Sequence, residues 1–168
     1  HFDEASNRAG ERAPYRGLAA FTRDEADNFV GREREAEAFA NRLRITPILA
    51  IVGPSGAGKS SFVQAGVMPL LGDGWETIIV RPGAGPEAAL RNGLMRAGVL
   101  AADSTDDLTG AGLGLALKRR AGEQGGRVLL YIDQFEELFT LCHDSAQRER
   151  YVDALVRAAT DPDDPVRV

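Results

Sequence analysis

The chain has 168 residues, of which 43% are hydrophobic and 27% charged, and it carries a net charge of −5 with an isoelectric point near 5.1. This length and balance predict one soluble domain with a real core. The acidic charge argues against general nucleic-acid binding, and no stretch of sequence predicts a membrane span. One cysteine and two histidines allow neither an internal disulfide nor a zinc cluster, which fits a reducing cytoplasm.

The N-terminal part predicts little structure before its first helices. Residues 1–13 are polar and without periodicity, and we expect an arm or linker there. The capping box at residues 22–25 predicts a short helix. A second, amphipathic helix is expected over 33–44, because Phe39 and Leu43 lie four residues apart on one face.

A glycine-rich loop follows an apolar run at residues 48–52 that is typical of a buried parallel strand. The loop fits the pattern G-x-x-x-x-G-K-[ST] at every specified position with Gly53, Pro54, Ser55, Gly56, Ala57, Gly58, Lys59 and Ser60. Such a loop points backbone N–H groups and a helix N-terminus at a polyphosphate. We expect Lys59 to reach the β- and γ-phosphates and the Ser60 hydroxyl to help coordinate Mg²⁺. The alternative, a glycine-rich turn with an incidental lysine, is disfavoured by the complete match.

Strands and helices alternate after the loop. We predict helices over 59–70, 86–98 and 112–122 and strands over 76–81 and 127–132. This alternation implies an α/β fold, a three-layer sandwich with a parallel sheet.

The strand at 127–132 ends in Asp133, which has the form of a Walker B strand. Asp133 is expected at the same sheet edge as the phosphate loop, where it would bind Mg²⁺ through water. Glu136 and Glu137 follow, and one of them could activate the attacking water, since Gln134 stands where many ATPases place that acid. The alternative is that both glutamates cap the first turn of a helix.

The C-terminal part predicts helices over 135–142 and 146–159 and then an acidic turn. Residues 165–168 have the pattern of another strand, with proline at its first position.

Four segments together resemble the STAND class of signal-transduction ATPases, and more narrowly the bacterial novel STAND NTPase domains that are often fused to WD-repeat propellers. The segments are 14–21 (PYRGLAAF), 29–33 (FVGRE), 53–61 (GPSGAGKSS) and 133–139 (DQFEELF). The resemblance covers residues 14–168.

The resemblance implies further site residues and a domain plan. Val30 and Arg32 would contact the adenine and the nucleotide, and Ser61 would join the phosphate loop. Residues 14–46 would form a nucleotide-gating segment, and 47–168 the core of a P-loop NTPase of the additional-strand class. In that class the next strand lies between the phosphate-loop strand and the Walker B strand and carries a polar sensor residue. We therefore expect a fragment that is incomplete at its C-terminus, with winged-helix and repeat domains as partners in the parent protein.

The leading hypothesis is a molecular switch that binds ATP or ADP with Mg²⁺, hydrolyses ATP slowly and controls assembly or signalling of a larger protein. ATP is favoured over GTP because the chain has no N-K-x-D motif. Nucleotide-dependent self-association would fit this role. Two alternatives are a housekeeping P-loop ATPase or nucleotide kinase, and a module that binds nucleotide without hydrolysing it, which Gln134 would suit.

Overall fold

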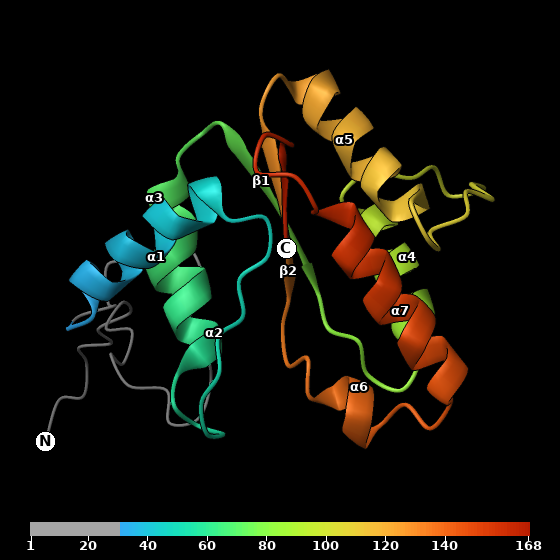
Figure 1. The fold of residues 1–168 in the computed structure, drawn as a ribbon, viewed down its shortest axis with the longest axis horizontal. Coiled ribbons are helices and arrows are strands. Elements are labelled where there is room, and N and C mark those ends of the chain that lie inside the picture. The colour runs from blue at the N-terminus through green and yellow to red at the C-terminus, as the bar shows by residue number, and fades with distance from the viewer. Residues whose placement is uncertain (1–30) are drawn as a thin grey trace, which may run out of the picture.

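The sheet of this molecule lies between two groups of helices, as the computed structural model of the chain shows (Figure 1). The structure describes residues 31–168. The predicted arm at 1–13, the capping box at 22–25 and Val30 lie outside the described residues. Helices on both faces of a parallel sheet agree with the expected α/β architecture.

Three parallel strands form the sheet in the order β1-β2-β3. These strands are β1 (Trp75–Val80), β2 (Arg127–Ile132) and β3 (Val166–Arg167). The register pairs Trp75 with Arg127 and Val80 with Ile132, so β1 and β2 end level with each other. The strands predicted at 76–81 and 127–132 are confirmed to within one residue, and β3 falls inside the strand predicted at 165–168.

The prediction of a strand at 48–52 is wrong, because this segment forms no regular strand. It does run beside β3: Leu49 N–H donates to Val168 O at 3.0 Å, and Val168 N–H donates to Pro47 O at 2.9 Å. No backbone hydrogen bond joins residues 50–52 to a neighbouring strand within the described part of the chain, and Val52 is 93% exposed. The spatial order is therefore β1, β2, β3 and then residues 47–49.

The helices begin close to the predicted positions. One group contains α1 (Glu33–Ile45), α2 (Lys59–Ser61), the π-helical stretch η2 (Phe62–Val67) and α3 (Met68–Leu71), the last three being one continuous helix. The other contains α4 (Pro86–Arg96), α5 (Gly112–Gln124), α6 (Glu137–Thr140) and α7 (Ser145–Ala158). The helix expected over 135–142 is shortened to α6, because residues 133–136 form turns.

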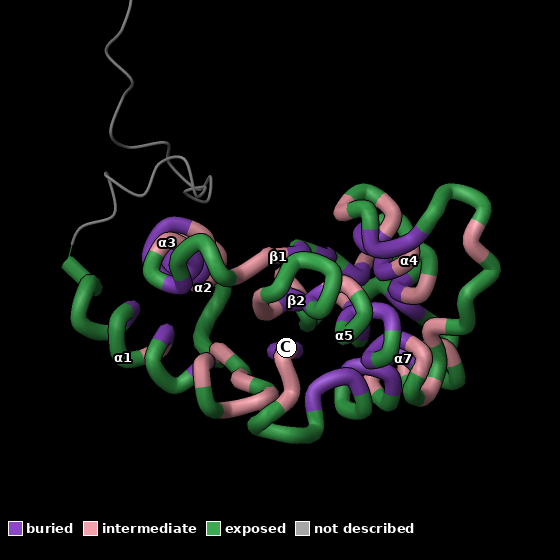
Figure 2. The backbone as a smooth tube through the Cα atoms, turned by 90° about the horizontal axis from the view of Figure 1, so that it is seen from above, coloured by how far each residue is buried: buried purple, intermediate pink, exposed green. Residues whose placement is uncertain are grey.

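Side chains of β2 alternate between two hydrophobic cores. Val128 and Leu130 pack with α4, α5 and α7, whereas Leu129 packs with α1 and η2. Successive side chains of a strand point to opposite faces, so one strand can serve both helical layers. Figure 2 shows the buried parts of the chain lining the interior on both sides of the sheet.

A fully buried arginine joins β3 to the end of α1. Arg167 donates from Nε to Leu43 O at 2.9 Å and from Nη2 to Arg44 O at 3.0 Å and Pro162 O at 2.6 Å. Arg127 donates to Arg44 O as well, at 2.7 Å. The last carbonyls of a helix have no partner within the helix, and here these arginines satisfy two of them. Because residues 46–52 follow α1 directly, the contacts also fix where the chain enters the glycine-rich loop.

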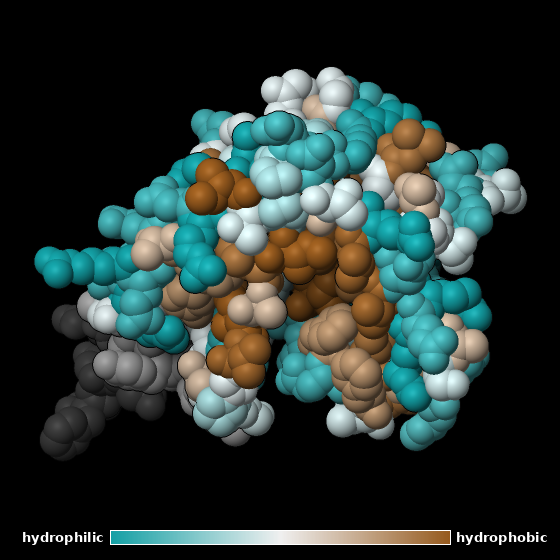
Figure 3. Space-filling view, viewed as in Figure 1, coloured by the Kyte–Doolittle hydropathy of each residue, from teal (hydrophilic) through white to brown (hydrophobic). Residues whose placement is uncertain are grey.

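An apolar hollow opens between the two helical layers on the face that Figure 3 shows. The hollow lies in front of the sheet, between the helix that follows the loop and α7. No helix of residues 31–168 is both long and apolar enough to cross a membrane.

Candidate functional site

The glycine-rich loop, residues 53–58, is exposed between residues 47–52 and α2. Gly56 and Gly58 have φ angles of +78° and +75°, in the left-handed region that favours glycine. No atom lies within 4 Å of a Cβ added at either position, so backbone conformation and not crowding requires these two glycines. The helix begins at Lys59, and its first N–H groups face the loop.

Lys59 folds back over its own loop. Its Nζ atom donates to Gly53 O at 2.9 Å and to Pro54 O at 3.1 Å. The ammonium group therefore lies at the loop, as the sequence predicts for a lysine that binds phosphate. Both of its partners are neutral carbonyls, which an anionic ligand could replace.

A serine and an aspartate from distant parts of the chain meet beside the loop. Ser60 Oγ donates to Asp133 Oδ1 at 2.6 Å across 73 residues of sequence. Tyr131 OH donates to the same oxygen at 2.9 Å. Burial beside the Asp133 carboxylate raises the pKa of Tyr131 well above its usual value, so this phenol stays a hydrogen-bond donor.

The oxygen atoms of Ser60 and Asp133 fit the preferences of Mg²⁺, a hard cation that takes few protein ligands and keeps several waters. Within residues 31–168 no group of three or more histidine, cysteine, aspartate or glutamate side chains could hold a metal ion. A cation at this place would therefore need phosphate oxygens and water to complete its coordination.

Glu136 and Glu137 occupy different environments. Arg81 Nε donates to Glu137 Oε1 at 2.8 Å, Arg81 Nη2 contacts the same oxygen, and the hydrogen bond to Arg81 holds the pKa of Glu137 below its usual value. The Glu136 side chain is exposed and makes no hydrogen bond or ion pair within the described residues. The turn before them includes Gln134, whose φ of +54° is the one left-handed non-glycine value in residues 31–168.

Arg81 was missed by the sequence reasoning. It directly follows β1, and Asp133 directly follows β2, where Asp133 N–H donates to Val80 O at 2.8 Å. An arginine just after a predicted strand of the same parallel sheet was the available signal. Its partner could not be identified from sequence, because Glu137 is 56 residues away.

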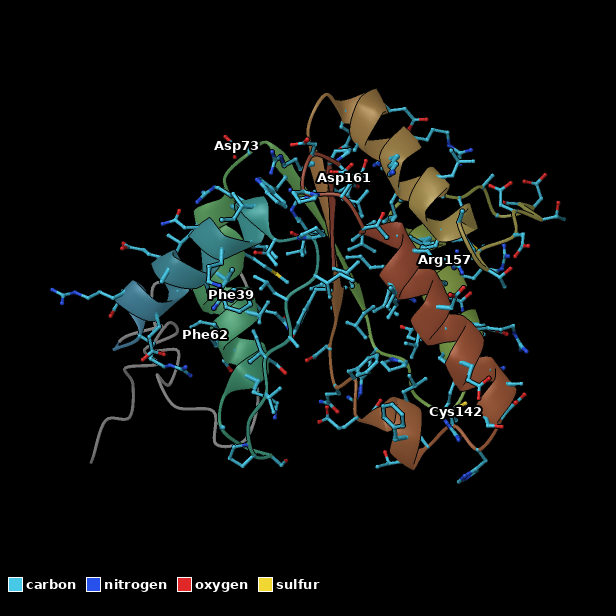
Figure 4. The ribbon with its side chains drawn as sticks, in the orientation of Figure 1. Phe39, Phe62, Asp73, Cys142, Arg157 and Asp161 are labelled. Carbon is cyan, nitrogen blue, oxygen red and sulfur yellow. The ribbon has the colours of Figure 1, made fainter. Side chains whose placement is uncertain are left out.

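Arg32 lies against the helix that follows the loop. Its guanidinium carbon is 4.6 Å from the centre of the Phe62 ring, and its Nε donates to Glu35 at 2.7 Å. Phe39 of α1 meets Phe62 edge to face, with ring centres 5.8 Å apart (Figure 4). Ser61 lies in the first turn of that helix and is half-buried. The structure thus places Arg32 beside Phe62, between α1 and the helix that follows the loop.

The fold and the contacts at the loop define a class of protein. A parallel sheet covered by helices, a glycine-rich loop that leads into a helix, and a serine–aspartate contact at the same sheet edge are compatible with an α/β fold of the NTPase type. The family described as Novel STAND NTPase 1 matches residues 14–168, and the chain belongs to that family. No curated protein and no solved structure matches the chain significantly. Family membership indicates a nucleotide-hydrolysing switch domain.

Proposed function

We propose that this chain is an ATP- and ADP-binding switch domain that hydrolyses ATP slowly with Mg²⁺ and regulates assembly or signalling of a larger protein. The observation that carries the proposal is the 2.6 Å contact between Ser60 and Asp133, because it joins the start of the loop helix to the end of β2. In P-loop NTPases these two positions hold the metal ion of the bound nucleotide. Other domains of the parent protein would be the partners of the switch.

The proposal includes the additional-strand class of P-loop NTPases. Its support is the spatial order β1, β2, β3 and residues 47–49, in which β3 lies between the segment before the loop and β2, the strand that Asp133 follows. Residues 47–168 would then be the catalytic core. The segment before them, including Val30 and Arg32, would contact the adenine and the nucleotide.

The residues of the site have distinct roles in this proposal. Backbone N–H groups of residues 53–61 and the Lys59 ammonium would bind the phosphates. Ser60 and Asp133 would hold Mg²⁺, with Tyr131 fixing the orientation of the Asp133 carboxylate through its hydrogen bond. Mg²⁺ would neutralise negative charge on the phosphate oxygens.

Glu136 is the better candidate for the general base. During hydrolysis the water oxygen bonds to the γ-phosphorus, the bond to the β–γ bridging oxygen breaks, and the proton of the water goes to a carboxylate. The Glu137 side chain is only 12% exposed, so water has less access to its carboxylate than to that of Glu136. Glu136 is exposed and unpaired within the described residues, which leaves its carboxylate able to accept a hydrogen bond from water.

Calorimetric titration with Mg²⁺-ATP, Mg²⁺-ADP and Mg²⁺-GTP tests the binding step, with Lys59→Ala as the matched variant. We expect both adenine nucleotides to bind, GTP to bind more weakly, and the variant to lose at least tenfold in ATP affinity because its phosphate-binding cation is gone. Equal affinities of the two proteins for ATP would contradict the assignment of the loop. Circular dichroism and the thermal midpoint of both proteins check that folding is unchanged.

A second candidate is a module that binds nucleotide without turnover. It is favoured by Gln134, which directly follows Asp133 and whose left-handed backbone turns the chain ahead of Glu136. ATP binding without phosphate release by the wild-type protein would support this candidate over the switch with slow hydrolysis.

A further inference from the structure

The sheet edge that carries the loop also carries an arginine to which the proposed function assigns no role. Arg81 follows β1 and Asp133 follows β2, and the parallel register ends both strands at the same level, with Val80 opposite Ile132. Asp133 in turn contacts Ser60 beside the loop. Arg81 therefore leaves the sheet on the side where the phosphates of a nucleotide would lie.

The negative charges of three carboxylates act on this one arginine, and one of them, Glu137, is in contact with it. The hydrogen bond to Glu137 raises the pKa of Arg81 most, and the negative charges of Asp133 and Glu136 raise it further. The Arg81 side chain is 57% exposed, whereas that of Glu137 is 12% exposed. Both hydrogen bonds of Arg81 go to one oxygen of Glu137, so within residues 31–168 three of its five N–H donors have no partner.

We propose that Arg81 discriminates ATP from ADP by exchanging its ion pair with Glu137 for the terminal phosphate of the triphosphate. This inference rests on the proposed function. A guanidinium group binds phosphate oxygens through paired hydrogen bonds and stays charged at every physiological pH, so a terminal phosphate is a stronger partner for it than a single carboxylate oxygen. ADP has no group at the terminal position, and in the ADP state Arg81 keeps Glu137.

The exchange would connect nucleotide state to local structure. Glu137 is the first residue of α6, and it is held from the side of β1 by Arg81 alone among side chains of the described residues. When Arg81 binds a phosphate, α6 loses its contact with Arg81, and the Glu137 carboxylate loses its ion-pair partner. Differential contacts of this kind are what a switch requires, since a ligand shifts an equilibrium only by its difference in affinity for the two states.

Substitutions on the two sides of this ion pair have opposite expected effects. Arg81→Gln removes the phosphate ligand, and we expect at least a tenfold loss of affinity for the β,γ-imido analogue of ATP with less than a twofold change for ADP. Arg81→Lys keeps the charge without the paired donors of the guanidinium group, and a smaller loss of triphosphate affinity is expected. Glu137→Gln frees Arg81 from its competitor, and affinity for the triphosphate should rise by a few fold. If the ion pair had only a structural role, Arg81→Gln and Glu137→Gln would change the affinity for the triphosphate in the same direction.

Calorimetry on the whole chain with both Mg²⁺-nucleotides measures these affinities. Arg157→Gln is the matched control, because Arg157 is an exposed arginine paired with Asp153 on α7, away from the loop (Figure 4). Equal losses for triphosphate and diphosphate in Arg81→Gln would overturn the proposal and leave the proposed function standing. A wild-type protein that binds neither nucleotide would overturn both. A specific loss for the triphosphate, with a gain in Glu137→Gln, would establish Arg81 as the discriminating residue.

Discussion

Two adjacent glutamates show how much of this site is decided by single side chains. The sequence presents Glu136 and Glu137 as equivalent acids after Asp133, and the structure distinguishes them by the contact of Glu137 with Arg81 and by the greater exposure of Glu136. Ser60, Lys59 and Asp133 were predictable because a loop pattern and a strand ending in an acid each have a known chemistry. Arg81 and Tyr131 were not, since their partners are set by the three-dimensional arrangement. The roles of all these residues in catalysis stay predictions.

Glu136→Gln tests the assignment of the base. General-base catalysis typically contributes about 10²- to 10⁴-fold, so we expect phosphate release from ATP to fall by at least about 100-fold while ATP affinity is unchanged. Glu137→Gln is the matched control and should retain hydrolysis within a few fold. The measurement is single-turnover phosphate release under saturating nucleotide. If Glu136→Gln releases phosphate at the wild-type rate, Glu136 is not the base.

At the scale of elements, the strands with strong patterns were predicted well. The apolar runs at 75–80 and 127–132 form β1 and β2, which pair along their whole length; β2 is buried on both faces at its centre, whereas β1 leaves Ile79 exposed. Residues 48–52 carry an equally apolar pattern, yet among them only Leu49 has a backbone hydrogen bond to a neighbouring segment, and Pro47 just before them has another. A β-strand requires a hydrogen-bonding strand beside it along its length, and the hydrophobic pattern of a sequence does not indicate whether such a partner is present.

The helix after the loop was predicted in extent but not in form. Its central stretch, Phe62–Val67, is π-helical, and Met68 N–H donates to Val63 O, five residues back. Pro69 follows, and its missing N–H removes the helical bond that residue 65 would otherwise accept. The proline is visible in the sequence, but the sequence does not indicate that the helix stays continuous through a π-helical stretch packed against α1.

The pH response of α6 follows from the lowered pKa of Glu137. A carboxyl group whose pKa is lower in the folded state stabilises the fold above its unfolded pKa, and this contribution is lost as the pH falls through the folded pKa. The hydrogen bond from Arg81 is the main cause, with the Gly83 backbone N–H also lowering the pKa of Glu137. We expect Arg81→Gln to raise the Glu137 pKa toward its ordinary value of 4.5. Carboxyl-carbon NMR titration of both proteins measures this shift, and an unchanged Glu137 pKa in the variant would contradict the ion pair.

For the whole molecule, the site lies where three separate segments converge at one sheet edge. The loop and its helix belong to one helical layer, whereas Arg81 and Asp133 leave strands that pack on the other core as well. The convergence was predictable from the parallel topology, because the carboxyl ends of parallel strands meet at one edge. The contact between the layer with the loop and the end of the sheet was not predictable, because it includes a buried cation that forms no ion pair with a carboxylate of residues 31–168.

Arg167 is that cation, and its substitution should weaken the packing between the helical layer with the loop and the sheet. The guanidinium group is fully buried, and it donates to carbonyls at the end of α1 and in the turn before β3. Arg167→Met fills a similar volume and leaves these carbonyls without a donor, so we expect the free energy of unfolding to fall by about 3 kcal/mol. Arg167→Lys keeps the charge but not the five donors, and an intermediate loss is expected.

Urea unfolding followed by circular dichroism measures the effect, with Arg157→Gln as an exposed control that should change stability by less than about 0.5 kcal/mol. The same variants bear on function, because α1 leads directly into the segment before the loop. If Arg167 fixes that segment, Arg167→Lys should weaken binding of ATP and ADP equally. The substitution would displace the loop, which binds both nucleotides, and would not affect contacts with the terminal phosphate alone. A selective loss for one nucleotide in Arg167→Lys would instead connect β3 to the discrimination assigned to Arg81. An unfolding midpoint of Arg167→Met equal to that of the wild type would show that the buried guanidinium does not hold the layers together.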